Sequence, residues 1–119
     1  MIRCWAYYRR YGNQLKTMSE HAVLNANYLR HKIIEEAKEK GVSDLFCDGA
    51  PVDVAKHEFT LSLAPMKEKM GIGAMDVAKG LLDKGYMAPT VYFPLVVPEC
   101  MMIEPTETES KDTTKDQNK

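Results

Sequence analysis

Apolar residues recur at helical spacing along two stretches of the chain. From residue 15 to residue 37 they return at three- and four-residue steps, which predicts one long amphipathic helix that ends at Gly41. A second stripe over residues 74–82 predicts a helix of about three turns, closed by Gly85 with Tyr86 placed for a Schellman contact. Residues 1–11 are aromatic and basic, and Gly12 separates them from the long helix.

One alternating stretch and two short apolar runs punctuated by prolines predict the strands. In "HEFTLSL" the residues Phe59, Leu61 and Leu63 alternate with polar ones, so one face meets a core and the other meets water or a partner. The phrases "TVYF" (90–93) and "CMMI" (100–103) predict two more strands, joined by the proline-bounded excursion "PLVVPE". In residues 42–56, Asp48-Gly49 and Pro51 indicate a turn.

The sum of these elements predicts an α+β fold, in which a small antiparallel or mixed sheet is covered on one face by helices. The expected parts are a linking helical segment over 1–41, a small α+β domain over 42–111 and a polar tail over 112–119. Thr106 and Glu109 have the spacing of a capping box, so a further helix is expected to start there. The tail has no apolar residue with which to pack, and we expect it to fray.

Composition narrows the class of protein. The chain of 119 residues is 45% apolar, enough for one modest core, and its 16 Lys and Arg against 17 Asp and Glu provide no basic field for nucleic acid. No apolar run approaches the ~20 residues that span a bilayer, and the N-terminus lacks the apolar core of a signal peptide. Three widely spaced cysteines without a C-x-x-C pair indicate reduced thiols in a cytoplasmic protein.

A search for chemistry finds no self-contained site. His21 and His31 lie ten residues apart on one helix and cannot share a metal, so no metal site is expected. The stretch "GIGAMD" (71–76) resembles a phosphate loop, but Asp76 would repel a phosphate at the helix start. The basic aromatic "YYRRYG" (7–12) could stack on nucleic acid, although a solvated or docking face is the more usual role.

Four collinear phrases carry a family resemblance: "AVLNANYL" (22–29), "HEFTLSL" (57–63), "DVAKGLLDKGYMAPT" (76–90) and "TVYFPLVVPECMMIEPTETESKDT" (90–113). Together they resemble the C-terminal part of the glycine dehydrogenase (decarboxylating) family, the P-protein of the glycine cleavage system. The long "YFPLVVPE" connection resembles the second subunit of the two-chain bacterial form.

The resemblance implies the aspartate-aminotransferase-like fold (fold type I), with a large pyridoxal-phosphate domain followed by a small α+β domain. Such an enzyme is an oxidoreductase of glycine catabolism that decarboxylates glycine and passes the aminomethyl group to the lipoyl arm of H-protein. The implied partners of this chain are the large domain or another P-protein subunit, and the full system's lipoylated H-protein. This chain would be the small domain with the helix that leads into it, and it would be inactive alone.

The family's Schiff-base lysine lies in an Asn-x-His-Lys phrase of the large domain. His31-Lys32 lacks the preceding asparagine and lies within the long helix, so Lys32 is rejected for that role and no catalytic or cofactor-binding residue is expected here. The strand "CMMIEP" (100–105) carries Glu104 where many relatives of the fold place a carboxylate-binding arginine. His57, Glu104 and Thr106 are the candidates for the edge of a cleft completed by the missing domain.

Two other readings remain. One is a free-standing protein-interaction module that keeps the small-domain fold. The other is a nucleic-acid binder built on "YYRRY". If the chain is instead the small domain of a P-protein, the face that the missing large domain would cover is expected to be apolar.

Overall fold

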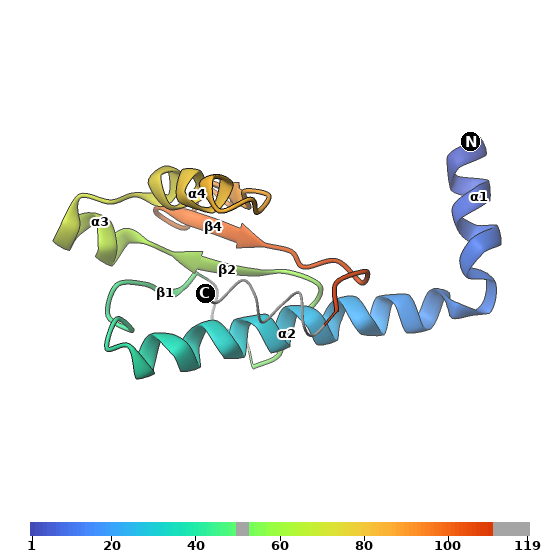
Figure 1. The fold of residues 1–119 in the computed structure, drawn as a ribbon, viewed down its shortest axis with the longest axis horizontal. Helices are drawn as coiled ribbons and strands as arrows, with labels where there is room; N and C mark the ends of the chain where they lie inside the picture. Colours follow the sequence, from blue (N-terminus) through green and yellow to red (C-terminus); the bar gives the residue numbers. More distant parts are fainter. Residues whose placement is uncertain (50–52, 111–119) are drawn as a thin grey trace.

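The computed structural model describes residues 1–49 and 53–110. The helices are α1 (Ile2–Tyr11), the short 3-10 helix η1 (Gly12–Gln14), α2 (Leu15–Glu39), α3 (Ala64–Met70) and α4 (Ala74–Asp83). The strands are β1 (Cys47–Asp48), β2 (Phe59–Ser62), β3 (Thr90–Val91) and β4 (Cys100–Ile103). They form one antiparallel sheet in the order β1-β2-β4-β3, which confirms the α+β prediction (Figure 1).

Helices α2 and α4 pack on one face of this sheet. Phe59 and Leu61 of β2 form a cluster with Ala26 and Leu29 of α2, while Leu63 just beyond β2 joins Ala74 of α4. Since Leu61 pairs with Met101 in register, both clusters lie on the same side of the strands. The predicted alternation of "HEFTLSL" is therefore confirmed for its apolar face.

The other face of the sheet is less exposed than the alternation predicts. Ser62 is 4% exposed and its register partner Cys100 is completely buried. The 92–98 loop, defined as residues Tyr92 to Pro98, covers them, and the Ser62 hydroxyl donates a hydrogen bond to the carbonyl of Pro98 at 2.7 Å. Burial of the Cys100 thiol raises its pKa. The proline-bounded excursion thus covers part of the sheet.

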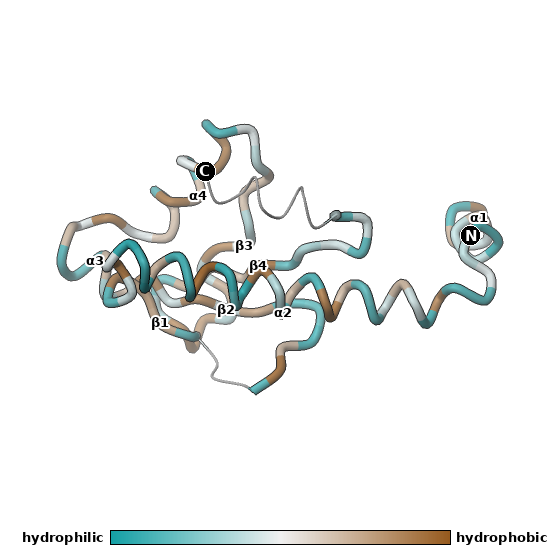
Figure 2. Tube along the Cα trace, turned by 60° about the horizontal axis from the view of Figure 1, so that its bottom comes forward, coloured by the Kyte–Doolittle hydropathy of each residue, from teal (hydrophilic) through white to brown (hydrophobic). Residues whose placement is uncertain are grey.

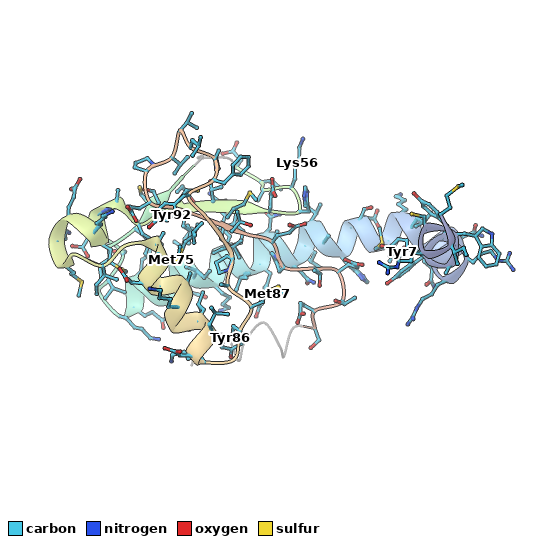
Figure 3. The ribbon with its side chains drawn as sticks, turned by 90° about the horizontal axis from the view of Figure 1, so that it is seen from above. Tyr7, Lys56, Met75, Tyr86, Met87 and Tyr92 are labelled. Atoms are coloured by element: carbon cyan, nitrogen blue, oxygen red, sulfur yellow. The ribbon has the colours of Figure 1, made fainter. Side chains whose placement is uncertain are left out.

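The helix ends follow the sequence closely. Gly41 adopts a φ of 67° after α2, as predicted. After α4, the amide of Gly85 donates to the carbonyl of Leu82 and that of Tyr86 donates to Leu81, which is the predicted Schellman pattern. Figure 3 labels Tyr86 beside the end of this helix.

Two asparagines of α2 fasten distant segments to this helix. They lie two positions apart and so face different sides of the helix. Asn25 donates to the carbonyls of Thr106 and Glu109 at 2.9 and 3.1 Å. Asn27 donates to the carbonyl of Ala55 at 2.7 Å and accepts from its amide at 2.9 Å. The phrase "AVLNANYL" therefore holds the chain before β2 and the chain after β4 against α2.

Several local predictions were wrong. Cys47–Asp48 forms strand β1 where a turn was expected, because Cys47 and Asp48 pair with Ser62 and Leu61. Helix α3 was missed although Pro65 lies in its first turn. The strand predicted over 90–93 stops at Val91, since Tyr92 has a φ of 60° and Pro94 cannot donate to the ladder.

No helix begins at Thr106 within the part of the chain that the structure describes. Glu109 donates to the carbonyl of Thr106 at 3.3 Å, which closes one turn only, and the Thr106 hydroxyl bonds that of Thr108 instead of capping. The segment is held by Asn25 and has no apolar stripe of its own. The predictions for Pro51 and for the 112–119 tail concern residues outside the described ones.

Candidate functional site

Two of the three residues predicted for a cleft edge lie together. The register of β2 with β4 pairs Phe59 with Ile103, so the residues before β2 lie beside those after β4. The His57 Nε2 atom is 3.8 Å from a carboxylate oxygen of Glu104 and 3.8 Å from one of Glu58. About half of each of the His57 and Glu104 side chains is exposed. Only the protonated imidazole would pair with these carboxylates.

Thr106 lies further along the same segment. Its hydroxyl is within hydrogen-bonding distance of that of Thr108, at 2.7 Å, and its carbonyl accepts from Asn25. Thr106 is exposed, so its contacts fix the path of the chain after β4. No contact joins it to His57 among those that the described residues make.

The start of α4, where the sequence resembles a phosphate loop, is filled by two carboxylates. Asp76 accepts from the amide of Gly73 at 3.0 Å, and Glu99 accepts from the amide of Ala74 at 2.9 Å. A helix N-terminus attracts anions, and here the chain's own side chains supply them. A phosphate would meet these charges, so the expected exclusion of phosphate has a second physical cause, Glu99.

Sequence reasoning did not single out Glu99. Besides the Ala74 amide, its carboxylate binds the ammonium of Lys67 on α3, and only 11% of its side chain is exposed. The hydrogen bond from Lys67, followed by that from the Ala74 amide, lowers the pKa of Glu99. Because Glu99 follows the 92–98 loop directly, this pair fixes one end of the loop to both α3 and α4.

Two cationic side chains of α2 are also engaged. Lys32 pairs with Glu35 at 2.5 Å, and this hydrogen bond raises the pKa of Lys32. A Schiff-base lysine needs the opposite shift, so that its amine is free to attack. Arg30 holds Asp48 with two hydrogen bonds, at 2.7 and 3.2 Å, which leaves this guanidinium committed to β1.

A hollow of about 270 Å³ lies between β1, α3 and the 92–98 loop. Its lining includes the carboxyl residues Asp48 and Glu68 but no Lys, Arg or His. Elsewhere in the described residues, no group of three His, Cys, Asp or Glu could hold a metal ion. This hollow therefore offers no cation that could bind a phosphate, and its Asp48 is already held by Arg30.

The exposed surface is apolar in two places. The 92–98 loop exposes Phe93, Leu95 and Val96 by 55%, 87% and 88%, and it contains no charged residue. The second place is α1, which exposes Ile2, Trp5 and Tyr8. Figure 2 shows this helix beyond the end of α2, away from the sheet. Such side chains are typical of surfaces that bind other proteins. The geometry therefore suits docking better than catalysis.

Comparison with known proteins gives a consistent result. The family model described as "Glycine dehydrogenase, C-terminal domain" matches residues 18–117. Two similar curated proteins are named "Probable glycine dehydrogenase (decarboxylating) subunit 2". That of Thiobacillus denitrificans is 46% identical over 114 residues, which is 95% of this chain. That of Aquifex aeolicus is 49% identical over 114 residues. The chain spans only 22% of the length of these relatives.

Proposed function

This chain belongs to the family of glycine dehydrogenase C-terminal domains, and we propose that it serves as the small C-terminal domain of a glycine-decarboxylating P-protein, subunit 2 of the two-chain form. The whole enzyme would decarboxylate glycine and pass the aminomethyl group to the lipoyl arm of H-protein. The observation that carries the proposal is the similarity over 95% of the chain to proteins of that name, of which it spans 22%. The fold would be the small domain of the aspartate-aminotransferase-like fold.

Pyridoxal phosphate does not fit the residues of this chain. Lys32 is held in an ion pair that raises its pKa, and the glycine-containing start of α4 is occupied by Asp76 and Glu99. We therefore assign the cofactor to a domain outside this chain, where it would act as the electron sink for the carbanion. The chain alone would not turn over glycine.

The role that fits the described residues is to complete a cleft and a protein interface. His57 and Glu104 form a half-exposed polar pair at one edge of the sheet, with Thr106 following on an ordered segment. The 92–98 loop would be buried against a partner, either the large domain or the other subunit. Its base is already fixed by Ser62 and Glu99, so little conformational entropy is lost on docking.

A cytoplasmic location is part of this proposal. It is supported by the sequence, in which Cys4, Cys47 and Cys100 are widely spaced and form no C-x-x-C pair. In the described part of the chain, no helix is both long and apolar enough to cross a bilayer.

Two measurements test the proposal. The isolated chain is titrated with pyridoxal phosphate and trapped with borohydride, and we expect no stoichiometric adduct at any lysine. In parallel, the chain replaces the matching C-terminal stretch of the Thiobacillus denitrificans subunit 2, and this chimaera is assayed with its partner subunit and H-protein for release of carbon dioxide from glycine. Full activity supports the domain assignment.

A folded chimaera without activity would instead favour the free-standing interaction module. A specific adduct at Lys32 would show that this chain has an active site of its own and would refute the proposal.

A further inference from the structure

Helix α1 is not held by the domain from which it projects. All ten of its residues are described and none is buried. Figure 1 shows it turned sharply away from α2. Gly12 makes the bend with a φ of 49°, a conformation that favours glycine. The side chains of Ile2, Trp5 and Tyr8, three positions apart along one side of the helix, are exposed by 84%, 66% and 60%.

The contacts that α1 makes are few. The Tyr7 hydroxyl lies against the sulfur of Met18 and is 3.4 Å from a carboxylate oxygen of Glu107. The guanidinium of Arg9 lies 5.8 Å from the Trp5 ring, within the same helix. A helix of this length is marginal in water without packing, since about 12–15 residues are needed even for good helix formers. Another surface must therefore stabilise α1.

The relatives indicate which part of the protein carries the surface that stabilises α1. The family model of the C-terminal domain begins at residue 18, after α1. The match to the Aquifex aeolicus subunit 2 covers 114 residues, 96% of this chain, so it must begin at residue 6 or earlier and include part of α1. Part of α1 is thus shared with the relatives but lies outside the residues that the family model matches. Most of the relatives' length also lies outside this chain.

Charge distinguishes α1 from the rest of the chain. Residues 1–19 contain no Asp or Glu and four cationic residues, Arg3, Arg9, Arg10 and Lys16. Residues 20–119 contain the other 12 of the 16 Lys and Arg and all 17 Asp and Glu. A surface that covers α1 should therefore combine an apolar site for Trp5 with surrounding carboxylates.

We propose that α1 is an element of the preceding domain of subunit 2, and that its Ile2, Trp5 and Tyr8 face is buried on an acidic-rimmed apolar surface of that domain. Gly12 and η1 then form the boundary between the two domains, which divides the helical segment predicted over 1–41. The proposal rests on the proposed function, and the partner of the α1 face is the region of subunit 2 that precedes the C-terminal domain.

Hydrogen exchange at residues 2–11 tests the proposal, in the isolated chain and in the chimaera described above. We expect fast exchange in the isolated chain and about 100-fold slower exchange in the chimaera, as for an element that opens only with its domain. Trp5→Ala in the chimaera should restore fast exchange in α1 and leave β2 and β4 protected. Met87→Ala is the matched control, since Met87 is 93% exposed and lies outside α1 (Figure 3).

The outcomes separate the two claims. An active chimaera in which α1 still exchanges quickly would overturn the inference and leave the proposed function intact. Protection of α1 in the isolated chain would also overturn it; if that protection rises with concentration, a second copy covers the helix. Activity of the chimaera reports on the proposed function independently of exchange in α1.

Discussion

Replacing Asn27 by alanine should destabilise the chain strongly, because the side chain of Asn27 provides the hydrogen-bond partners of a buried backbone amide and carbonyl. The residue it holds, Ala55, is 3% exposed. Both the amide and the carbonyl of Ala55 bond to Asn27, at 2.9 and 2.7 Å. Each buried group left without a partner costs about 1–3 kcal/mol, so losing both partners should lower the free energy of unfolding of Asn27→Ala by roughly 2–6 kcal/mol.

A loss of that size is a large part of the roughly 5–15 kcal/mol that stabilises a typical domain. The assay is urea unfolding of the purified chain, followed by far-ultraviolet circular dichroism, with the same m-value for both proteins. Asn27→Asp should also destabilise, since a carboxylate can accept from the Ala55 amide but cannot donate to its carbonyl.

Asn13, an exposed asparagine in η1, provides the control. Asn13→Ala should change stability by no more than about 0.5 kcal/mol. If Asn27→Ala cost no more than this control, the reasoning would be refuted, because water would then be replacing the asparagine at Ala55.

Three further predictions concern four residues. Gly49→Ala should destabilise the chain by about 1–3 kcal/mol, because the new Cβ would lie 2.7 Å from the Thr60 hydroxyl and 2.9 Å from a Val97 methyl. Gly80→Ala should stabilise it by about 0.5–1 kcal/mol, since Gly80 lies within α4 and its new Cβ would have no neighbour within 4 Å among the described residues, apart from the adjoining residues and the helix backbone. Thermal melts of both variants check these two signs. Because the folded chain lowers the pKa of Glu99, its carboxylate contributes stability at pH values above the ordinary pKa of 4.5, and this stability is lost as the pH falls below that value. Glu99→Gln should therefore flatten the acid limb of a plot of unfolding free energy against pH. An unchanged limb would argue against the contacts of Glu99 with Lys67 and Ala74. Like the unchanged chain, Lys32→Ala should form no pyridoxal phosphate adduct that borohydride can trap, and mass mapping would check this.

Much of the fold could be predicted from periodicity, because each of these signals is carried by neighbours in the chain. The spacing of Leu29 and Ala37 within α2, the alternation around Leu61 and the glycine after α4 each act over a few residues. The strand "CMMI" was predicted with its observed bounds from another local signal, a short apolar run between two prolines. The adjacency of His57 and Glu104 needed the register of β2 with β4 as well, which the sequence does not state.

What the sequence alone determined is the set of local elements, the family resemblance and the lack of a local catalytic phrase. Tertiary structure decided the rest. Strand β1 has two residues, too few to show a period, and exists because Leu61 and Ser62 pair with it. Glu99 reaches the α4 N-terminus from 25 residues away, and Ser62 is buried because the 92–98 loop returns over it. Each depends on contacts between distant segments, whose free energy is gained only when the sheet assembles.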